Sequence, residues 1–168
     1  MQVVSFVAAS SDSGKTTLIE KIVPILKARG LRVAVIKHAS AGFDLDRPGT
    51  DSQRFQQAGA DTVILVGPGA VALMTRAETE PSTAELERMA GDVDVVIYEG
   101  FKKSARNKIE VFRTGISGDR PLCLNDPSFI ALVSDQRFDC SLPQFTLHDA
   151  KGVAEFIQSR AVDTEDAE

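Results

Sequence analysis

The strongest chemical signal in the sequence is the segment 9–16, which reads Ala-Ser-Ser-Asp-Ser-Gly-Lys-Thr. Gly-Lys-Thr after four variable residues, between an apolar run and a helix-like stretch, is typical of a P-loop that binds a nucleoside triphosphate. Backbone N–H groups and the positive helix end would bind phosphate. Lys15 would contact the β- and γ-phosphates, and the Thr16 hydroxyl would be a ligand of Mg²⁺. The predicted phosphate-binding residues are Ser11, Asp12, Ser13, Gly14, Lys15, Thr16 and Thr17.

Two residues depart from the usual motif. Ala9 stands at the first position, where Gly is usual, and Asp12 places a carboxylate in a loop that binds anions. Both residues bear on the shape of the loop, and Asp12 also bears on its affinity. One alternative is therefore a purely structural partner protein whose loop no longer binds nucleotide.

A second ligand for the metal is predicted at Glu99, directly after the apolar run 95–98. P-loop proteins bind Mg²⁺ with a carboxylate at the end of a neighbouring strand. The alternative is an ordinary strand-end glutamate that caps the turn at Gly100.

Lys37 and His38 end another predicted strand, at the position where open α/β sheets bind their ligands. We predict that they contact the γ-phosphate or a second substrate. His38 could also act as a general base, because the pKa of histidine lies near neutrality. Asp44, Asp46 and Asp51 follow in an acidic loop, with Asp46 a candidate metal ligand and Asp51 a candidate nucleotide contact. A solvated loop, and for Asp51 a helix N-cap, are the alternatives.

Recognition of guanine usually needs a carboxylate that accepts two hydrogens from the base, but the usual Asn-Lys-x-Asp motif is absent. The segment 107–110, Asn-Lys-Ile-Glu, is similar but comes before its apolar strand, which favours an ordinary strand entry. Ser134 and Asp135 follow the run 130–133 at a strand's carboxyl end, so we prefer Asp135 as the base contact.

A short basic segment begins at Lys102 and continues with Lys103, Arg106 and Lys108. In an acidic protein such a local patch suits the phosphate of a nucleotide or a pterin. A solvated turn is the alternative.

The composition fits one compact domain, since 43% of the 168 residues are hydrophobic. We predict a nucleotide-binding domain over 1–160 and a disordered acidic tail over 161–168. The net charge of -5 argues against a nucleic-acid binder, and no apolar run approaches the length of about 18 residues that spans a membrane. Cys123 and Cys140 lack metal-ligand spacing, which favours a reducing cytoplasm.

Apolar runs alternate with helix-like stretches along much of the chain, which predicts an α/β fold with a mostly parallel sheet. The predicted strands are 3–8, 32–36, 62–66, 93–98 and 130–133, and the predicted helices are 15–29, 51–58, 83–90 and 150–159. Residues 63–66 and 71–75 flank Gly-Pro-Gly, so they should form an antiparallel hairpin. This hairpin could extend the sheet or pair between subunits. The whole pattern predicts a three-layer, P-loop NTPase-like fold.

Several segments together resemble the molybdopterin-guanine dinucleotide biosynthesis adaptor (MobB) family. They are the P-loop with Thr16-Thr17-Leu18, Ile36-Lys37-His38, the run from Asp44 to Ser52, Ala58-Gly59-Ala60 and Glu99-Gly100-Phe101-Lys102. Members of that family commonly have Gly where this chain has Asp12.

The resemblance implies a dimeric, GTP-binding adaptor that assists the guanylyltransferase attaching GMP to molybdopterin. It also implies at most a weak GTPase activity. The P-loop itself predicts Mg²⁺ as a cofactor, and the basic segment makes molybdopterin a further candidate ligand. A P-loop kinase that phosphorylates a small molecule is the alternative, because the same residues could transfer a γ-phosphate.

Overall fold

The computed structural model describes residues 1–40, 42–43, 47–102 and 105–162. The chain divides into two compact units, one formed by Met1–His38 with Thr83–Glu168 and the other by Ala39–Ser82. Each unit is described by itself. None of the helices in these described ranges is long and apolar enough to cross a lipid bilayer.

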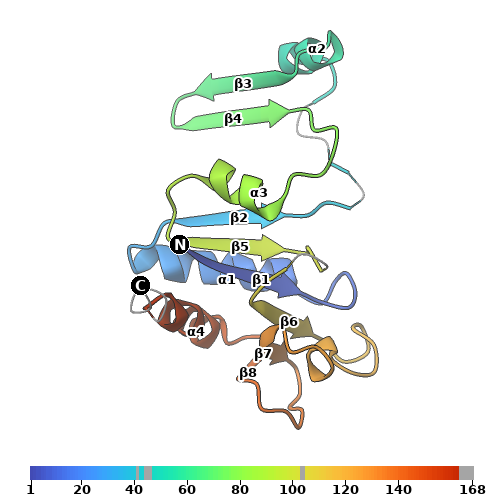
Figure 1. The fold of residues 1–168 in the computed structure, drawn as a ribbon, viewed down its shortest axis with the longest axis vertical. Coiled ribbons are helices and arrows are strands. Elements are labelled where there is room, and N and C mark those ends of the chain that lie inside the picture. Colours follow the sequence, from blue (N-terminus) through green and yellow to red (C-terminus); the bar gives the residue numbers. More distant parts are fainter. Residues whose placement is uncertain (41, 44–46, 103–104, 163–168) are drawn as a thin grey trace. The chain divides into compact units, whose positions relative to one another are not determined.

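A six-stranded, fully parallel sheet forms the centre of the larger unit, with the strand order β2-β5-β1-β6-β7-β8 (Figure 1). The strands are β1 (Gln2–Val7), β2 (Val33–Lys37), β5 (Val95–Glu99), β6 (Lys108–Phe112), β7 (Phe129–Ser134) and β8 (Gln144–Thr146). All residues of β1 and β5 are buried, as expected for strands covered on both faces. The predicted parallel α/β sheet is therefore confirmed.

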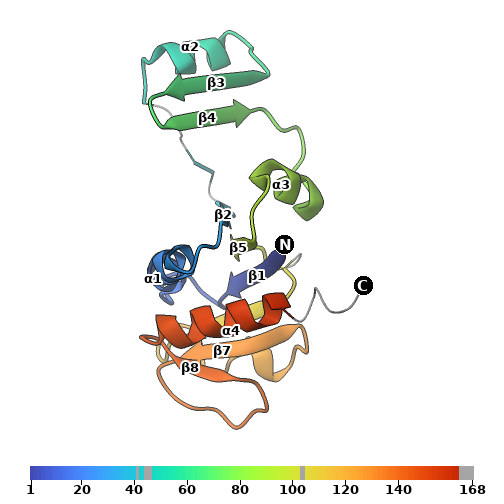
Figure 2. The ribbon, with the colours of Figure 1, turned by 90° about the vertical axis from the view of Figure 1, so that its left-hand side faces the viewer.

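Helices α1 (Lys15–Ala28) and α4 (Ala150–Val162) cover one face of this sheet (Figure 2). Their apolar residues, such as Ile22 and Ile157, pack against Val4 and Phe6 of the central strand. Helix α3 (Thr83–Ala90) and the short 3₁₀ helix η1 (Leu122–Leu124) pack on the opposite face. The result is the predicted three-layer arrangement. Helix α4 continues to Val162, and residues 163–168 of the predicted tail lie outside the described residues.

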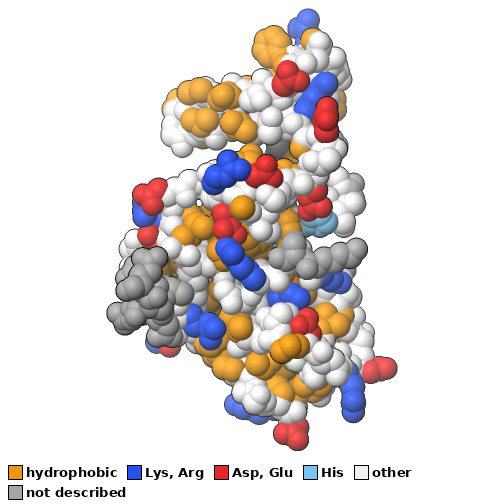
Figure 3. All heavy atoms as spheres, viewed as in Figure 1, with side chains coloured by type: hydrophobic (Ala, Val, Ile, Leu, Met, Phe, Trp, Pro, Cys, Tyr) orange, Lys and Arg blue, Asp and Glu red, His pale blue; other side chains and the backbone are white. Residues whose placement is uncertain are grey.

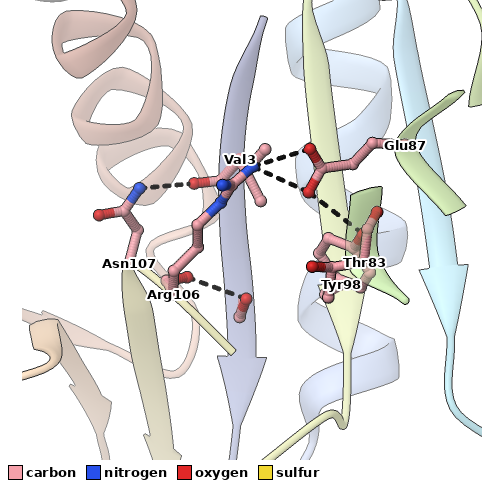
Figure 4. Close-up of polar contacts among 7 residues, drawn as sticks. Val3, Thr83, Glu87, Tyr98, Arg106 and Asn107 are labelled. Carbon is pink, nitrogen blue, oxygen red and sulfur yellow. Dashed lines mark hydrogen bonds and ion pairs between the residues drawn. The ribbon is translucent and has the colours of Figure 1, made fainter. Parts of the chain in front are cut away.

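Polar contacts fix α3 to the strand that ends at Glu99 (Figure 4). The Tyr98 hydroxyl donates to the Thr83 carbonyl at 3.1 Å and to Glu87 Oε1 at 3.3 Å. The Arg106 guanidinium binds both oxygens of Glu87 at 2.8 Å. Burial first, and then the Glu87 carboxylate, raise the pKa of Tyr98 to about 12, so the phenol stays a hydrogen-bond donor.

The smaller unit contains α2 (Asp51–Gln57) and the strands β3 (Thr62–Gly67) and β4 (Ala70–Thr75). The two strands pair antiparallel, with Val63 opposite Met74, so the predicted hairpin is confirmed. It forms a two-stranded sheet of its own and pairs with no strand of the six-stranded sheet among the described residues. Of the two arrangements predicted for the hairpin, extension of the main sheet is therefore not seen in the described part of the chain.

Candidate functional site

The P-loop connects β1 to α1. Gly14 and Asp12 both adopt left-handed backbone conformations, with φ of 96° and 58°. Ser13 is fully buried, and the Leu18 N–H donates to the Gly14 carbonyl at 3.0 Å to begin the helix. The Lys15 ammonium folds over the loop and donates to the Ser10 carbonyl at 3.2 Å and to Ser13 Oγ at 3.3 Å.

Two of the three predicted metal ligands, Thr16 and Glu99, are in direct contact. Thr16 Oγ1 donates to Glu99 Oε1 at 2.6 Å, and the other Glu99 oxygen lies 3.5 Å from Lys37 Nζ. This contact arises because β1 and β5 are parallel neighbours whose carboxyl ends meet beside the P-loop. The described residues contain no cluster of three or more His, Cys, Asp or Glu side chains that could hold a metal. One hydroxyl and one carboxylate next to a phosphate site nevertheless suit Mg²⁺, which keeps several waters and phosphate oxygens as ligands.

Burial lowers the pKa of the Lys15 ammonium, and the neighbouring Glu99 carboxylate is the largest opposing influence. Lys102 and Lys37 also lower this pKa, while Asp12 raises it. The Lys102 ammonium donates to the Ala9 carbonyl at 2.6 Å, so it supports the start of the loop from outside. A phosphate group would compensate this concentration of positive charge.

His38 and Gly100 approach each other closely at the ends of β2 and β5. The His38 N–H donates to the Glu99 carbonyl at 2.9 Å, and a Cβ on Gly100 would lie 3.2 Å from His38 Cβ. The His38 ring contacts the Phe101 ring edge-on, with 5.1 Å between centroids. These contacts fix His38 at the site, and its role as a general base stays a prediction.

A cavity of about 470 Å³ joins most of these residues. Its lining contains the predicted residues Ser11, Asp12, Gly14, Lys15, Thr16, Thr17, Lys37, His38 and Glu99, together with Gly100 and Arg113. Arg113 was not predicted, although it directly follows β6 and so lies at the carboxyl edge of the sheet. A larger, open hollow of about 1050 Å³ lies beside η1 and contains none of the phosphate-binding residues.

The two residues predicted to contact the base lie at the end of β7 but do not line this cavity. Ser134 Oγ bonds locally, donating to the Gln136 carbonyl at 2.7 Å and accepting from the Gln136 N–H at 3.1 Å. Asp135 accepts the N–H of Thr114 at 3.1 Å and its hydroxyl at 2.9 Å. Burial raises the pKa of Asp135, but the Thr114 hydrogen bonds outweigh it and the net shift is downward. The carboxylate is therefore held ionised and oriented.

Other predicted residues lie elsewhere. Asp51 is the first residue of α2 in the smaller unit and lies 3.4 Å from Arg54. The N-cap of α2 is Thr50, whose hydroxyl accepts the Gln53 N–H, so the N-cap alternative for Asp51 is wrong. Asp44 and Asp46 fall outside the described residues, so the candidate metal ligand Asp46 stays a prediction.

The basic segment after Glu99 does not form one patch in the described part of the chain. Arg106 binds Glu87, and Lys108 binds Asp126 at 3.2 Å at the amino end of β6, away from Lys102. Lys103 lies outside the described residues. The segment 107–110 is confirmed as a strand entry, because β6 begins at its second residue. Its last residue, Glu110, is fully buried and binds backbone N–H groups.

Comparison with known proteins gives one consistent result. The family model described as "Molybdopterin guanine dinucleotide synthesis protein B" matches residues 3–135. The molybdopterin-guanine dinucleotide biosynthesis adapter protein of Escherichia coli (strain K12) is 37% identical over 156 residues, which cover 89% of this chain and 88% of that protein. The adapter protein of Haemophilus influenzae is 34% identical over 154 residues, which cover 89% and 84%.

Solved structures agree with the sequence comparison. A crystal structure of molybdopterin-guanine biosynthesis protein B superposes with a TM-score of 0.72 at 33% identity, covering 95% of this chain and 98% of that one. Bacillus subtilis MobB gives a TM-score of 0.73 at 24% identity over 95% and 98%, which shows the shared fold. On the length and consistency of these matches, the chain belongs to the molybdopterin guanine dinucleotide synthesis protein B (MobB) family.

Proposed function

We propose that this protein is a GTP-binding adaptor in the biosynthesis of molybdopterin guanine dinucleotide, and that its partner is the guanylyltransferase of that pathway. The adapter role follows from the names of relatives that match along most of the chain. Nucleotide binding is supported above all by the 2.6 Å contact between Thr16 and Glu99 beside a P-loop. That contact places a hydroxyl and a carboxylate where a P-loop protein binds Mg²⁺.

The residues of the cavity divide into two roles. The P-loop N–H groups and Lys15 would bind phosphate, with Lys15 exchanging its bonds to Ser10 and Ser13 for phosphate oxygens. Thr16 and Glu99 would hold Mg²⁺, which would neutralise charge on the phosphates. Lys37, now 3.5 Å from Glu99, lies beside this metal position and would contact the γ-phosphate.

Guanine would be recognised by Asp135. An ionised carboxylate only accepts hydrogen bonds, and the Watson–Crick edge of guanine presents adjacent N–H donors. The two bonds from Thr114 hold this carboxylate at the carboxyl end of β7, one strand beyond β6 in the sheet. Adenine has no matching pair of donors, so Asp135 would favour GTP over ATP.

Hydrolysis would be slow. The residues that line the described cavity include no glutamine to orient a water molecule, and His38 is the candidate base. A slow reaction suits an adaptor, because its bound nucleotide would support the interaction with the partner enzyme and would not need to be turned over quickly. A fast turnover without the partner would contradict this role, and a phosphorylated small molecule would identify the alternative, a P-loop kinase.

We also infer that the protein forms a homodimer through the β3–β4 hairpin. One face of the hairpin packs on α2, where Gln56 Nε2 lies 3.1 Å from Met74 Sδ. On the other face, the paired residues Ile64 and Leu73, and Val66 and Val71, are 51–80% exposed. Figure 3 shows hydrophobic side chains gathered on the hairpin. A two-stranded sheet alone is only marginally stable, and this exposed apolar face needs a partner. We therefore infer that a second copy of this chain buries it.

Calorimetric titration of GTP, GDP and ATP, with and without Mg²⁺, tests the nucleotide site. We expect Lys15→Ala to weaken GTP binding by roughly tenfold or more, because a charge-assisted contact to phosphate is lost. Lys151→Ala, an exposed residue on α4, is the matched control. Asp135→Ala should lose the preference for GTP over ATP without losing triphosphate binding. Wild-type protein that binds no nucleotide in the presence of Mg²⁺ would exclude the proposal.

The adaptor role needs a separate assay. The wild-type protein should raise the yield of molybdopterin guanine dinucleotide formed by purified guanylyltransferase, and Lys15→Ala should raise it less. An unchanged yield with the wild-type protein would refute the adaptor role even if GTP binds.

A further inference from the structure

The connection that follows β6 is bonded to the P-loop. Ser10 Oγ donates to the Ile116 carbonyl at 2.8 Å. The Arg113 carbonyl accepts the N–H groups of Ile116 at 3.1 Å and Ser117 at 2.9 Å, while Ser117 Oγ accepts the Arg113 N–H at 3.0 Å. Ser117 is 3% exposed, so its hydrogen bonds to Arg113 are largely shielded from water. The backbone of Arg113 is therefore fixed, through both its N–H and its carbonyl, relative to the phosphate loop.

The side chain of Arg113 is exposed at the P-loop cavity. Its guanidinium makes no hydrogen bond or ion pair with any residue in the described ranges, whereas Arg29, Arg32 and Arg106 all do. A guanidinium stays charged at physiological pH, and its planar set of donors matches phosphate oxygens. The Arg113 backbone is fixed and its guanidinium can still form hydrogen bonds, as expected of a residue that binds a ligand.

Charge at the cavity gives Arg113 a specific importance. The lining contains three cations, Lys15, Lys37 and Arg113, and two carboxylates, Asp12 and Glu99. Without Arg113 the charged side chains of the lining would cancel, and attraction for a polyphosphate would depend on the P-loop N–H groups and the positive helix end. With Arg113 the net charge of the lining is positive.

The strand order indicates which phosphates Arg113 reaches. Glu99 and Lys37 end β5 and β2, on one side of β1, whereas Arg113 follows β6 on the other side, toward Asp135 at the end of β7. With the proposed nucleotide site, the γ-phosphate and the metal would lie on the first side, and the nucleoside would lie on the second. We propose that Arg113 binds the α- and β-phosphates, a role that rests on the proposed nucleotide site and adds a contact that the P-loop motif does not contain.

Titration of GTP and GDP into Arg113→Gln, with Mg²⁺ present, tests this inference. We expect both affinities to fall by a similar factor, roughly 10- to 100-fold, because both nucleotides contain the same two phosphates. Arg113→Lys should recover part of the loss, since it restores the charge without the paired donors. Arg120→Gln, an exposed arginine on the same connection that does not line this cavity, should bind like the wild type.

Each other result has a definite meaning. A loss confined to GTP would place Arg113 at the γ-phosphate, and unchanged affinity for both nucleotides would remove it from the site; either result overturns the inference while the proposed function stands. Wild-type protein that binds neither nucleotide would refute both. The thermal unfolding midpoint of Arg113→Gln should match that of the wild type, because the replaced side chain makes no hydrogen bond or ion pair with the residues that the structure describes.

Discussion

Asp12 combines two properties that oppose each other in a phosphate loop. Its φ of 58° lies in the left-handed region, where aspartate and asparagine are among the best tolerated residues after glycine. The departure from Gly therefore keeps the shape of the loop. Its side chain is exposed and lines the cavity. Asp12 should therefore weaken phosphate binding through its negative charge.

Asp12→Asn should consequently bind GTP more tightly than the wild type, by roughly two- to tenfold, because one like charge is removed near the phosphates. Asp12→Gly should show a similar gain, since both residues accept the left-handed backbone. The gain, measured by calorimetry, should shrink as salt is added, as expected for an exposed charge. Asp119→Asn, an exposed carboxylate outside this cavity, is the control. Equal GTP affinity for Asp12→Asn and the wild type would mean that this carboxylate does not face phosphate.

The residues of the site differ in how far the sequence could reveal them. The P-loop was predictable because its residues are contiguous, and Glu99 because it ends a buried run. Arg113 was not, since its importance depends on β6 lying next to β1, and sheet order is set by tertiary packing. Asp135 and Thr114 are likewise brought together only by the pairing of β6 with β7.

The same limit applies to the secondary structure. Buried strands such as β1 and β5 were predictable as short apolar runs rich in Val and Ile, and the hairpin was predictable from its turn sequence. The three-residue elements β8 and η1 were not, because so few residues show no periodicity. In β6 a buried glutamate interrupts the apolar run, which made Glu110 look like part of a base-binding motif.

Glu110 instead stabilises η1. Its fully buried carboxylate accepts the N–H of Leu122 at 2.9 Å and that of Cys123 at 2.8 Å. Burial first, and then the hydrogen bond and charge of Glu110, raise the pKa of the Cys123 thiol to about 12. Since the thiolate is the reactive form, Cys123 should be inert in the folded protein.

Labelling with a disulfide reagent should therefore detect one fast thiol per native chain, Cys140, which is partly exposed. Cys123 should react only after denaturation, and Cys140→Ser should abolish the fast phase. Glu110→Gln should speed the labelling of Cys123 and lower the free energy of unfolding by about 1–3 kcal/mol, because a buried N–H loses its acceptor. Fast labelling of Cys123 in the native wild type would contradict this account.

For the whole molecule, the division into two units separates the two proposed activities, nucleotide binding and dimerisation. The residues that line the P-loop cavity all belong to the larger unit, and the exposed apolar face of the hairpin belongs to the smaller one. Dimerisation and nucleotide binding should therefore be separable by mutation. The cross-strand pair Val66 and Val71, 80% and 70% exposed, is the best position for such a test.

Val66→Lys combined with Val71→Lys should convert the dimer to a monomer, because burying two adjacent charges against a second apolar face is costly. Sedimentation velocity over a range of concentrations measures the change, and Met89→Lys, an exposed apolar residue on α3, is the control. The double variant should bind GTP with the affinity of the wild type. A double variant that remains dimeric would exclude the hairpin as the interface, and a loss of GTP binding would show that the two units depend on each other.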